Sequence, residues 1–412
     1  MNILFIHQNF PAQYKHLALL MAADPANRVV VLHMRQNLPE IPGITAVHIT
    51  PDRALTTGLH PWLQEFESKF IRGDATWKAA CSLRESGFTP AVVCAHPGWG
   101  EALFVKDVWP GARLLSYLEY YYHFRRQDIN FDPEFPSRPD DSCRLRIKNI
   151  NNLLALEACD AGISPTEYQR SLQPAEYQSK ISVIHDGIDT DRVRPNRDVT
   201  LTMKERGVTL TSRDEVITFV NRNLEPYRGW HTFARALPEL LARRPRAHVL
   251  IVGGDDVSYG SRPADGVSYK QRYLAEVIDR LDLNRIHFLG KIPYDTLLGL
   301  LQISSAHVYL TYPFVLSWSM LEAMSAGALV IGSRTAPVEE VITHGVNGLL
   351  VDFFSQEELV ATVDELLSHP DRMQAVRDRA RQTIVERYDL RRICLPQQQA
   401  LLHNLVTGKR EG

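Results

Sequence analysis

The sequence predicts an α/β protein with two doubly wound parallel sheets, one in each half of the chain. The length of 412 residues exceeds what one hydrophobic core usually supports. Short apolar runs alternate with segments of helical spacing in both halves. These runs are apolar throughout, as is typical of strands that are covered on both faces. The alternation favours two Rossmann-like domains, although the pattern alone leaves a closed barrel open.

The first series of elements reaches to about residue 190. An apolar run at 3–6, helical spacing over 14–23 and a second run at 29–33 predict a β-α-β unit. Further strands are expected at 91–95, 113–117, 161–164 and 181–184.

The segment 189–214 is polar, carries Pro195 and Gly207 and has no sustained apolar period, so we expect the domain junction within it. A second series follows, with strands expected at 216–221, 247–253, 286–289, 307–310, 329–332 and 348–351. We therefore expect an N-terminal domain over 1–195, a C-terminal domain over 196–385, and a helical tail over 386–412 that packs on the N-terminal domain.

Composition excludes several classes of function. A net charge of −2 argues against nucleic-acid binding, which usually needs a basic excess. The five cysteines form no C-x-x-C pair, so neither a zinc site nor a disulfide framework is expected. The N-terminus reads as a strand rather than a signal peptide, and no run is long enough to span a bilayer, so we expect a cytoplasmic protein. The aromatic and basic run at 120–126 leaves a peripheral membrane contact open, with an aromatic cluster as the alternative.

An apolar helix in the sequence WSMLEAMSAG is the strongest local signal in the second half. Its expected N-terminus lies at Ser317, Trp318 and Ser319, where free N–H groups can bind a phosphate. Glu322, one turn into the helix, can accept hydrogen bonds from a ribose. The alternative is that Glu322 points to solvent or pairs with an arginine.

Two arginines follow the first strand of the second series. Arg222 and Arg228 lie in NRNLEPYRGWHTF on either side of a turn that contains proline, so both can reach the same site. Guanidinium groups match phosphate oxygens and neutralise the charge of a departing diphosphate. Each arginine taken alone could equally be a surface residue.

With these motifs the C-terminal half resembles the retaining family 4 glycosyltransferases of the GT-B fold, in which two such domains face a central cleft. The family's glycine-rich loop is matched by Gly253 and Gly254, and its F-x-G-x-x-P segment by FLGKIPYDTL, which carries Lys291 and Ile292. The helix motif E-A-M-A-x-G-x-P-V is similar to EAMSAGALV.

Three positions depart from the family pattern. Phe314 stands where the family has the first acid of its E-x7-E signature, an acid that approaches the donor sugar. Ser317 replaces the glycine of that signature, and Arg228 replaces a lysine, which keeps the charge but changes the geometry.

The N-terminal half resembles the family less closely. Its first strand is followed by HQNFPAQY, with Pro11 and Ala12, where the family has Gly-Gly. In HPGWGE, His96 follows a strand at the place where the family often has a histidine facing the reacting centre; a structural histidine is the alternative. Glu119 is a candidate for contacting the acceptor, and Asp186 in IHDGID resembles the family's N-G-V-D turn; turn stabilisation is the alternative for both.

The resemblance implies transfer from a UDP- or GDP-sugar with retention, and no metal ion or other cofactor. Implied acceptors are glycans, lipid-linked compounds or small molecules, and cell-envelope or exopolysaccharide synthesis is the implied setting. A nucleotide-sugar epimerase is the enzyme alternative. A non-catalytic protein that binds sugar nucleotides or glycans is the second alternative, and Phe314 is the residue that favours it.

Overall fold

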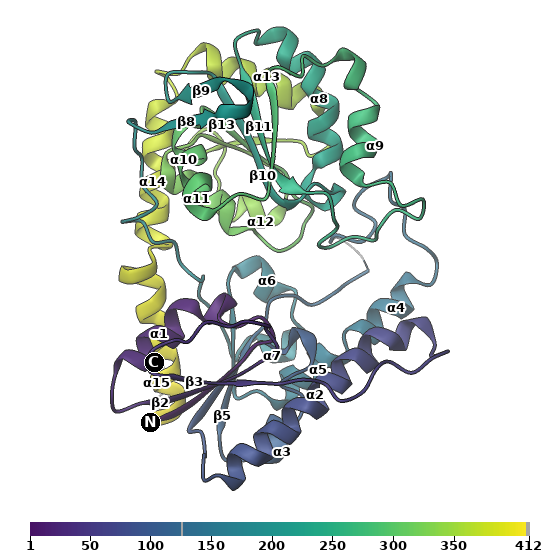
Figure 1. Cartoon of the computed structure of the whole chain (residues 1–412), viewed down its shortest axis with the longest axis vertical. Coiled ribbons are helices and arrows are strands. Elements are labelled where there is room, and N and C mark those ends of the chain that lie inside the picture. The colour runs from purple at the N-terminus through teal and green to yellow at the C-terminus, as the bar shows by residue number, and fades with distance from the viewer. Residues whose placement is uncertain (125–126, 409–412) are drawn as a thin grey trace. The chain divides into compact units, whose positions relative to one another are not determined.

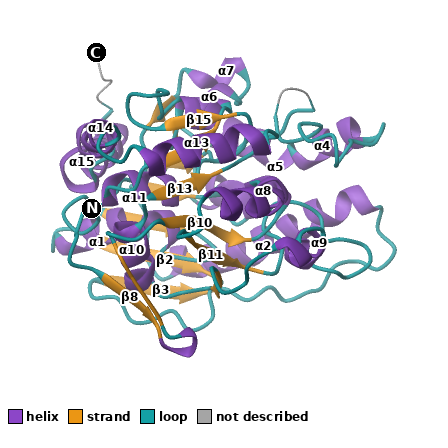
Figure 2. Cartoon of the chain, turned by 90° about the horizontal axis from the view of Figure 1, so that it is seen from above, coloured by secondary structure: helices purple, strands orange, loops and turns teal. Residues whose placement is uncertain are grey.

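The computed structural model describes residues 1–124 and 127–408. The chain forms two compact units, one made of Met1–Asp186 and Arg391–Gly412 and the other of Gly187–Leu390. Each unit consists of a sheet covered by helices (Figures 1 and 2). Both arginines of the run at 120–126, Arg125 and Arg126, lie outside the described residues.

The first unit contains a seven-stranded sheet in the order β3-β2-β1-β4-β5-β6-β7, and each neighbouring pair is parallel. The strands are β1 (Asn2–Ile6), β2 (Arg28–His33), β3 (Ile44–His48), β4 (Val92–Ala95), β5 (Arg113–Tyr117), β6 (Ala161–Ser164) and β7 (Ile181–Val183). Its helical segments are η1 (Ala12–Tyr14), α1 (Lys15–Ala23), α2 (Pro61–Glu85), η2 (Pro97–Trp99), α3 (Val105–Val108), α4 (Asp141–Lys148), α5 (Ile150–Ala158), α6 (Glu167–Ser171), α7 (Ala175–Gln178) and α15 (Leu395–Thr407).

Both faces of this sheet are covered, which explains its continuous apolar runs. In β1, Ile3 and Phe5 pack in the core that includes α1 and α15, whereas Leu4 and Ile6 pack in the core that includes α2 and α3. The yellow helix α15 lies beside the purple helix α1 in Figure 1, although the two are far apart in the sequence.

The second unit contains a six-stranded parallel sheet in the order β12-β11-β10-β13-β14-β15, and a separate hairpin. The sheet strands are β10 (Val216–Asn223), β11 (His248–Gly254), β12 (Ile286–Gly290), β13 (Ala306–Tyr309), β14 (Val330–Ser333) and β15 (Leu349–Val351); the hairpin is β8 (Thr200–Met203) and β9 (Val208–Thr211). The helical segments are η3 (Lys204–Arg206), η4 (Pro226–Arg228), α8 (Trp230–Arg243), α9 (Tyr269–Ala275), η5 (Ile278–Arg280), α10 (Tyr294–Ile303), α11 (Trp318–Ala326), α12 (Ala336–Glu339), α13 (Gln356–Ser368) and α14 (Gln374–Arg387). A π-helix, η6 (Leu390–Cys394), precedes α15.

Each sheet reverses its strand order at one point, between β1 and β4 in the first unit and between β10 and β13 in the second. In open α/β sheets, ligands bind beyond the carboxyl ends of the strands at such a switch point. The loops that follow these four strands are therefore the places where functional residues are expected.

Two features of the fold are absent from the sequence predictions. The edge strand β3 was not expected, because its side chains are partly or fully exposed and form no buried apolar run. The hairpin β8–β9 occupies the segment interpreted as a junction without regular structure. Leu210 in this hairpin is buried in the core of the second unit, and Leu201 and Val208 pack partly against that core.

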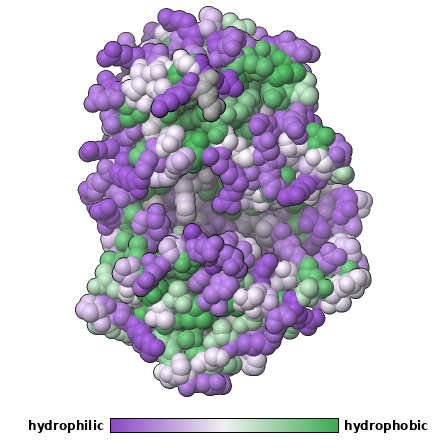
Figure 3. Space-filling model, viewed as in Figure 1, coloured by the Kyte–Doolittle hydropathy of each residue, from purple (hydrophilic) through white to green (hydrophobic). Residues whose placement is uncertain are grey.

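Among the described residues, none of the helices has both the length and the apolar character needed to cross a bilayer. The face shown in Figure 3 is mainly hydrophilic, and its hydrophobic side chains lie in groups between polar ones.

Candidate functional site

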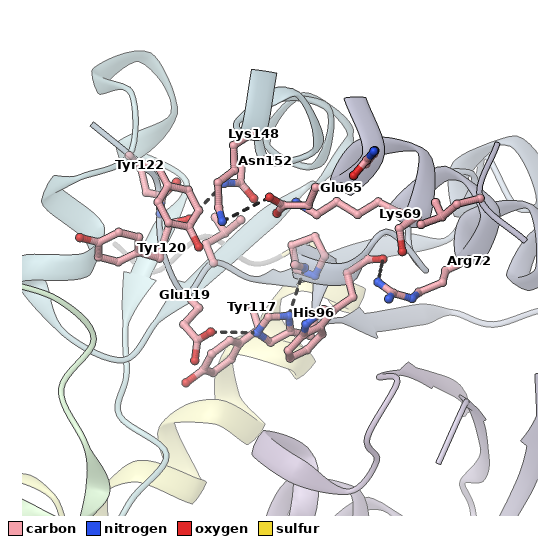
Figure 4. A pocket seen from close by; sticks show the side chains of 18 residues that line it. Glu65, Lys69, Arg72, His96, Tyr117, Glu119, Tyr120, Tyr122, Lys148 and Asn152 are labelled. Atoms are coloured by element: carbon pink, nitrogen blue, oxygen red, sulfur yellow. Dashed lines mark hydrogen bonds and ion pairs between the residues drawn. The ribbon is translucent and has the colours of Figure 1, made fainter. Parts of the chain in front are cut away.

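A cavity of about 480 Å³ opens in the first unit, at the carboxyl ends of β4 and β5 (Figure 4). The helix α2 forms a large part of its wall, and α4 and α5 contribute one residue each. The lining residues are Leu55, Gln64, Glu65, Ser68, Lys69, Arg72, His96, Pro97, Gly98, Trp99, Tyr117, Leu118, Glu119, Tyr120, Tyr122, Lys148, Asn152 and Gln173. Two residues singled out from the sequence, His96 and Glu119, therefore line the same cavity.

The imidazole of His96 is fixed on three sides. Its Nδ1 accepts a hydrogen bond of 3.1 Å from the backbone N–H of Gly98 and so caps η2. Its ring stacks on Trp99 at 4.4 Å and on Tyr117 at 5.4 Å between ring centroids. Because Nδ1 is an acceptor, the neutral ring carries its proton on Nε2, which lies 3.6 Å from Oε2 of Glu119.

A second histidine, His7, approaches His96 across the switch point, with ring centroids 5.2 Å apart. Its Nδ1 accepts a hydrogen bond from the N–H of Asn9 at 3.0 Å, so Nε2 donates to Oε1 of Gln13 at 2.8 Å. The amide of Gln13 in turn donates to Oε1 of Glu119 at 3.5 Å. Burial, with a contribution from His96, lowers the pKa of His7 to about 3, so its ring is neutral near pH 7.

The loop HQNFPAQY supplies this network through residues that sequence reasoning missed. Pro11 and Ala12 were the residues named from that loop, and neither lines the cavity. They lie between His7 and Gln13, and Pro11 precedes the 3-10 helix that contains Gln13. A polar pair on either side of a Pro-containing turn directly after a strand was the signal that could have identified His7 and Gln13.

Glu101 is a buried acid next to this cavity that the sequence did not single out. Its side chain is 2% exposed, and neither carboxyl oxygen has a hydrogen-bond partner among the described residues. Burial raises the pKa of Glu101 to about 7, although Arg72, His96 and Lys69 act in the opposite direction.

Asp186 lies outside the cavity but is tied to one of its walls. It is buried, and its Oδ2 accepts a hydrogen bond of 2.9 Å from the hydroxyl of Tyr117. Since Tyr117 stacks on His96, Asp186 acts on the cavity through this tyrosine.

In the second unit, several candidates lie at the carboxyl edge of the sheet. Arg222, near the end of β10, is exposed, and so is Lys291 directly after β12. A Cβ atom on Gly254 would lie 2.6 Å from Oδ1 of Asn223 and 3.0 Å from Cε of Lys291. Glycine at this position therefore allows these polar side chains to pack against the backbone. Asn223 Oδ1 is buried without a hydrogen-bond partner among the described residues.

The other residues of these two motifs pack within the unit. Gly253 has a φ of +156°, and a Cβ atom there would lie 2.9 Å from Leu224. Ile292 is partly buried against the hydrophobic core.

Arg228 is 3% exposed and joins the two halves of the sheet at the switch point. Its Nη1 donates to the hydroxyls of Tyr309 at 3.2 Å and Thr311 at 2.8 Å, and to the carbonyl of Val315 at 3.0 Å. Its guanidinium group also lies over the ring of Tyr259 at 4.8 Å. Arg228 thus holds the loop after β13, in contrast to the exposed Arg222.

Phe314 belongs to a buried aromatic cluster at the same edge. Its ring lies 5.5 Å from Tyr227 and 5.0 Å from Tyr259, in edge-to-face geometry. It fills apolar space where the sequence pattern of similar proteins has an acid.

The sequence did not single out Glu225, which organises the loop after β11. This carboxylate is fully buried and accepts hydrogen bonds from the backbone N–H groups of Ser258 at 3.0 Å, Tyr259 at 3.1 Å and Gly260 at 3.3 Å. The residue lies within NRNLEPYRG, between the two arginines that drew attention to that motif.

The helix α11 begins at this edge. Ser317 caps it, with Oγ accepting from the N–H of Ser319 at 3.4 Å, and Trp318 is 44% exposed. Glu322, one turn into α11, accepts a hydrogen bond of 2.8 Å from the hydroxyl of Tyr294, so its carboxylate is tied to α10.

No group of three or more His, Cys, Asp or Glu side chains with the geometry of a metal site occurs in the part of the chain that the structure describes.

Two family models match the chain. Residues 25–193 match the glycosyl transferase family 4 group, and residues 203–383 match the glycosyl transferases group 1. The first match contains β2 to β7 of the first sheet, and the second match contains the whole six-stranded sheet of the second unit.

Similar curated proteins include a D-inositol 3-phosphate glycosyltransferase of Corynebacterium jeikeium, which is 27% identical over 46% of this chain and 44% of its own length. Another is a GDP-mannose-dependent alpha-(1-6)-phosphatidylinositol monomannoside mannosyltransferase of Mycolicibacterium smegmatis, 26% identical over 60% of this chain and 62% of its own. The chain thus spans less than two thirds of the length of these relatives.

Two solved structures match over nearly the whole chain. Sucrose-phosphate synthase from Thermosynechococcus elongatus has a TM-score of 0.75 at 16% identity, with 99% of this chain and 100% of that chain covered. Anabaena HepE in complex with UDP and glucose has a TM-score of 0.66 at 17% identity, with 98% and 99% covered. The family matches to both units and the shared fold show that the chain is a member of the family 4, group 1 glycosyltransferases with the GT-B fold.

Proposed function

We propose that the protein transfers a sugar from a UDP- or GDP-sugar to an acceptor hydroxyl, with retention at the anomeric carbon. The observation that carries this proposal is the match of the second unit to the group 1 glycosyltransferases, combined with exposed cations at the carboxyl edge of its sheet. The solved HepE structures are complexes with UDP or UDP-glucose, and the mycobacterial relative is named as GDP-mannose-dependent. These names support a nucleoside diphosphate donor and leave the base to be measured.

On the donor side, Arg222 and Lys291 are the exposed cations proposed to contact the diphosphate. As the glycosidic bond breaks, negative charge grows on the departing phosphate, and positive side chains there lower the barrier. Glu322 is proposed to bind the ribose, positioned by its hydrogen bond from Tyr294. Arg228 is proposed to act indirectly, because it holds the loop that leads to Ser317.

On the acceptor side, the cavity around His96 is proposed to receive the acceptor. The N–H at Nε2 of His96 can donate to a sugar or acceptor oxygen, while Glu119 can accept a hydrogen bond from a hydroxyl. In a retaining reaction of this kind, the leaving phosphate takes the proton of the attacking hydroxyl, so the role of Glu119 is to orient that hydroxyl. The proposed setting is cell-envelope or exopolysaccharide synthesis.

The test is a thermal-shift screen of the purified protein against UDP, GDP, ADP and their common sugar conjugates. Donor binding raises the melting temperature through linkage, and we expect the rise for one base to be lost in Arg222→Ala and Glu322→Ala. Arg213→Ala is the matched control, because Arg213 is an exposed arginine that precedes β10, at the opposite edge of the sheet. Loss of the shift in the control as well would contradict the assigned donor edge.

Product analysis then separates transfer from its alternatives. Incubation with the identified donor and an acceptor panel is expected to give a new glycoside whose first-formed anomer, seen by NMR, matches that of the donor. An inverted anomer refutes retention. Conversion of the donor sugar to its epimer without acceptor identifies an epimerase, and tight donor binding without turnover identifies a binding protein.

A further inference from the structure

The cavity in the first unit has an excess of positive charge in its lining. Lys69, Arg72 and Lys148 line it together with two carboxylates, Glu65 and Glu119. Figure 4 shows that Lys148 and Glu65 approach one another on one side of the cavity, and that Glu119 points to His96 on another side. The lining therefore carries three cations and two carboxylates, which is an excess of one positive charge.

Two of these cations, Lys69 and Lys148, already hold an anion, the carboxylate of Glu65. Nζ of Lys69 lies 3.1 Å from one carboxylate oxygen of Glu65, and Nζ of Lys148 lies 3.4 Å from the other. Burial opposes ionisation of Glu65, yet Lys148 and Lys69 hold its pKa below the ordinary value. Lys148 is itself fixed over the ring of Tyr122, at 4.4 Å. The two ammonium groups thus already share one carboxylate of the protein.

Arg72 lacks such a partner. Its Nη1 donates to the backbone carbonyl of Trp99 at 3.3 Å, and no carboxylate forms an ion pair with it among residues 1–124 and 127–408. Glu101 is an acid close enough to interact with it electrostatically, but this carboxyl is buried and does not line the cavity. A guanidinium group has five N–H donors, so Arg72 keeps donors for a ligand.

We propose that this cavity binds an acceptor that carries an anionic group, a phosphate or a carboxylate, held by Arg72 and Lys148, with Glu65 as an internal competitor for the same cations. This inference rests on the proposed function, because it assigns a substrate class to the acceptor cavity. When the anion binds, it replaces Glu65 as the partner of Lys148 and provides the partner that Arg72 lacks. Arginine and lysine side chains are the groups that bind phosphate and carboxylate most strongly.

The experiment measures binding of inorganic phosphate by line broadening of its ³¹P NMR signal. Excess UDP and GDP are both present throughout, so that the donor site is filled whichever base it binds. Saturable broadening is expected in the natural protein. In Arg72→Gln and in Lys148→Gln, the affinity is expected to fall about tenfold, because each loses a charge-assisted hydrogen bond.

Glu65→Gln is expected to act in the opposite direction. Without Glu65 as a competitor, we expect the affinity for phosphate to rise about fivefold. This factor corresponds to the free energy of a partly exposed ion pair. A merely structural role for Glu65 would weaken binding or leave it unchanged. Lys15→Gln is the matched control, because Lys15 is an exposed cation of the same unit outside the cavity. The phosphate affinity of this variant is expected to equal that of the natural protein.

Competition with sugars identifies the anion. Glucose 6-phosphate, glucuronate and neutral glucose are added in turn, and at least one charged sugar is expected to displace phosphate at concentrations where glucose does not. If glucose 6-phosphate competes more strongly than glucuronate, the anionic group of the acceptor is a phosphate. The reverse order identifies a carboxylate.

Three results overturn the proposal: no saturable broadening, equal affinity in Arg72→Gln and Lys15→Gln, or displacement by neither charged sugar. Failure of the proposed transferase function would appear separately, as absence of a thermal shift with any nucleotide.

Discussion

At the scale of single residues, Glu101 makes the stability of the folded protein depend on pH. Its carboxyl group is buried, and its pKa is raised to about 7 from an ordinary value of 4.5, chiefly by burial. The folded protein therefore binds this proton more tightly than the unfolded chain does. The stabilisation that results is complete below about pH 4.5 and is lost as the pH rises through 7.

We expect the substitution Glu101→Gln to remove this pH dependence. The neutral amide has a similar shape, so stability near pH 4.5 should change little. At pH 8 the natural protein carries the cost of a buried charge, about 3 kcal/mol for a shift of this size, and the variant should unfold at a higher temperature. Differential scanning calorimetry between pH 4.5 and 8 measures both proteins. Parallel pH profiles would show that Glu101 is not the titrating group.

Individual site residues were accessible from the sequence where they follow a strand. His96 and Arg222 were named with such positions in view, and the structure places His96 in one cavity with Glu119, which was named without that reason. Lys69 and Lys148 were not accessible, because a cation on a helix is normally a solvated residue, and only the packing of α2 near α4 reveals their shared partner Glu65. The network through His7 and Gln13 depends in the same way on contacts between loops.

At the scale of secondary-structure elements, the turn between β10 and α8 positions the switch-point edge of the second unit. Gly229 lies in this turn with a φ of +68°, a left-handed conformation that favours glycine. A Cβ atom there would lie 2.3 Å from Cβ of Leu310, directly after β13. The turn and β13 therefore pack backbone against side chain, with no space for a methyl group.

We expect Gly229→Ala to destabilise the second unit by about 3 kcal/mol, from backbone strain and the clash with Leu310 together. Gly207→Ala is the matched control. Gly207 has a φ of +63°, yet nothing lies within 4 Å of the added Cβ atom, so strain alone, about 1 kcal/mol, should remain. Urea unfolding measures both variants, and equal losses would refute the close approach.

Some strands could be predicted from the sequence and others could not, and the difference follows from how many faces of each strand are buried. Strands buried on both faces, such as β1 and β11, carry continuous apolar runs and were expected. The edge strand β3 and the hairpin β8–β9 were not, because each has at most one buried side, and short alternating segments resemble polar loops.

At the scale of the whole molecule, the C-terminal helix α15 completes the first unit. Leu402 is 1% exposed in the core that contains α1, and the amide of Gln398 donates to the carbonyl of His185 at 3.2 Å. Removal of this helix exposes apolar surface of the first unit and leaves the sheet of the second unit intact.

We expect deletion of residues 395–412 to lower the melting temperature of the first unit by several degrees or to unfold it, while the thermal shift with nucleotide is retained. Calorimetry with and without the identified nucleotide separates the two units. Simultaneous loss of both transitions would show that the second unit depends on α15. A full-length variant with Gln398→Ala is the milder control, because it removes one hydrogen bond and keeps the helix.

The second unit is one continuous stretch of chain, and its two ends meet. The backbone N–H of Ile188 donates to the carbonyl of Tyr388 at 2.8 Å, and the N–H of Leu390 donates to the carbonyl of Ile188 at 2.8 Å. The first unit, by contrast, needs residues from both sides of that stretch. During synthesis on the ribosome, all residues of the second unit are therefore present before those of the first unit are complete. The first unit can form its full core only after α15 has been synthesised.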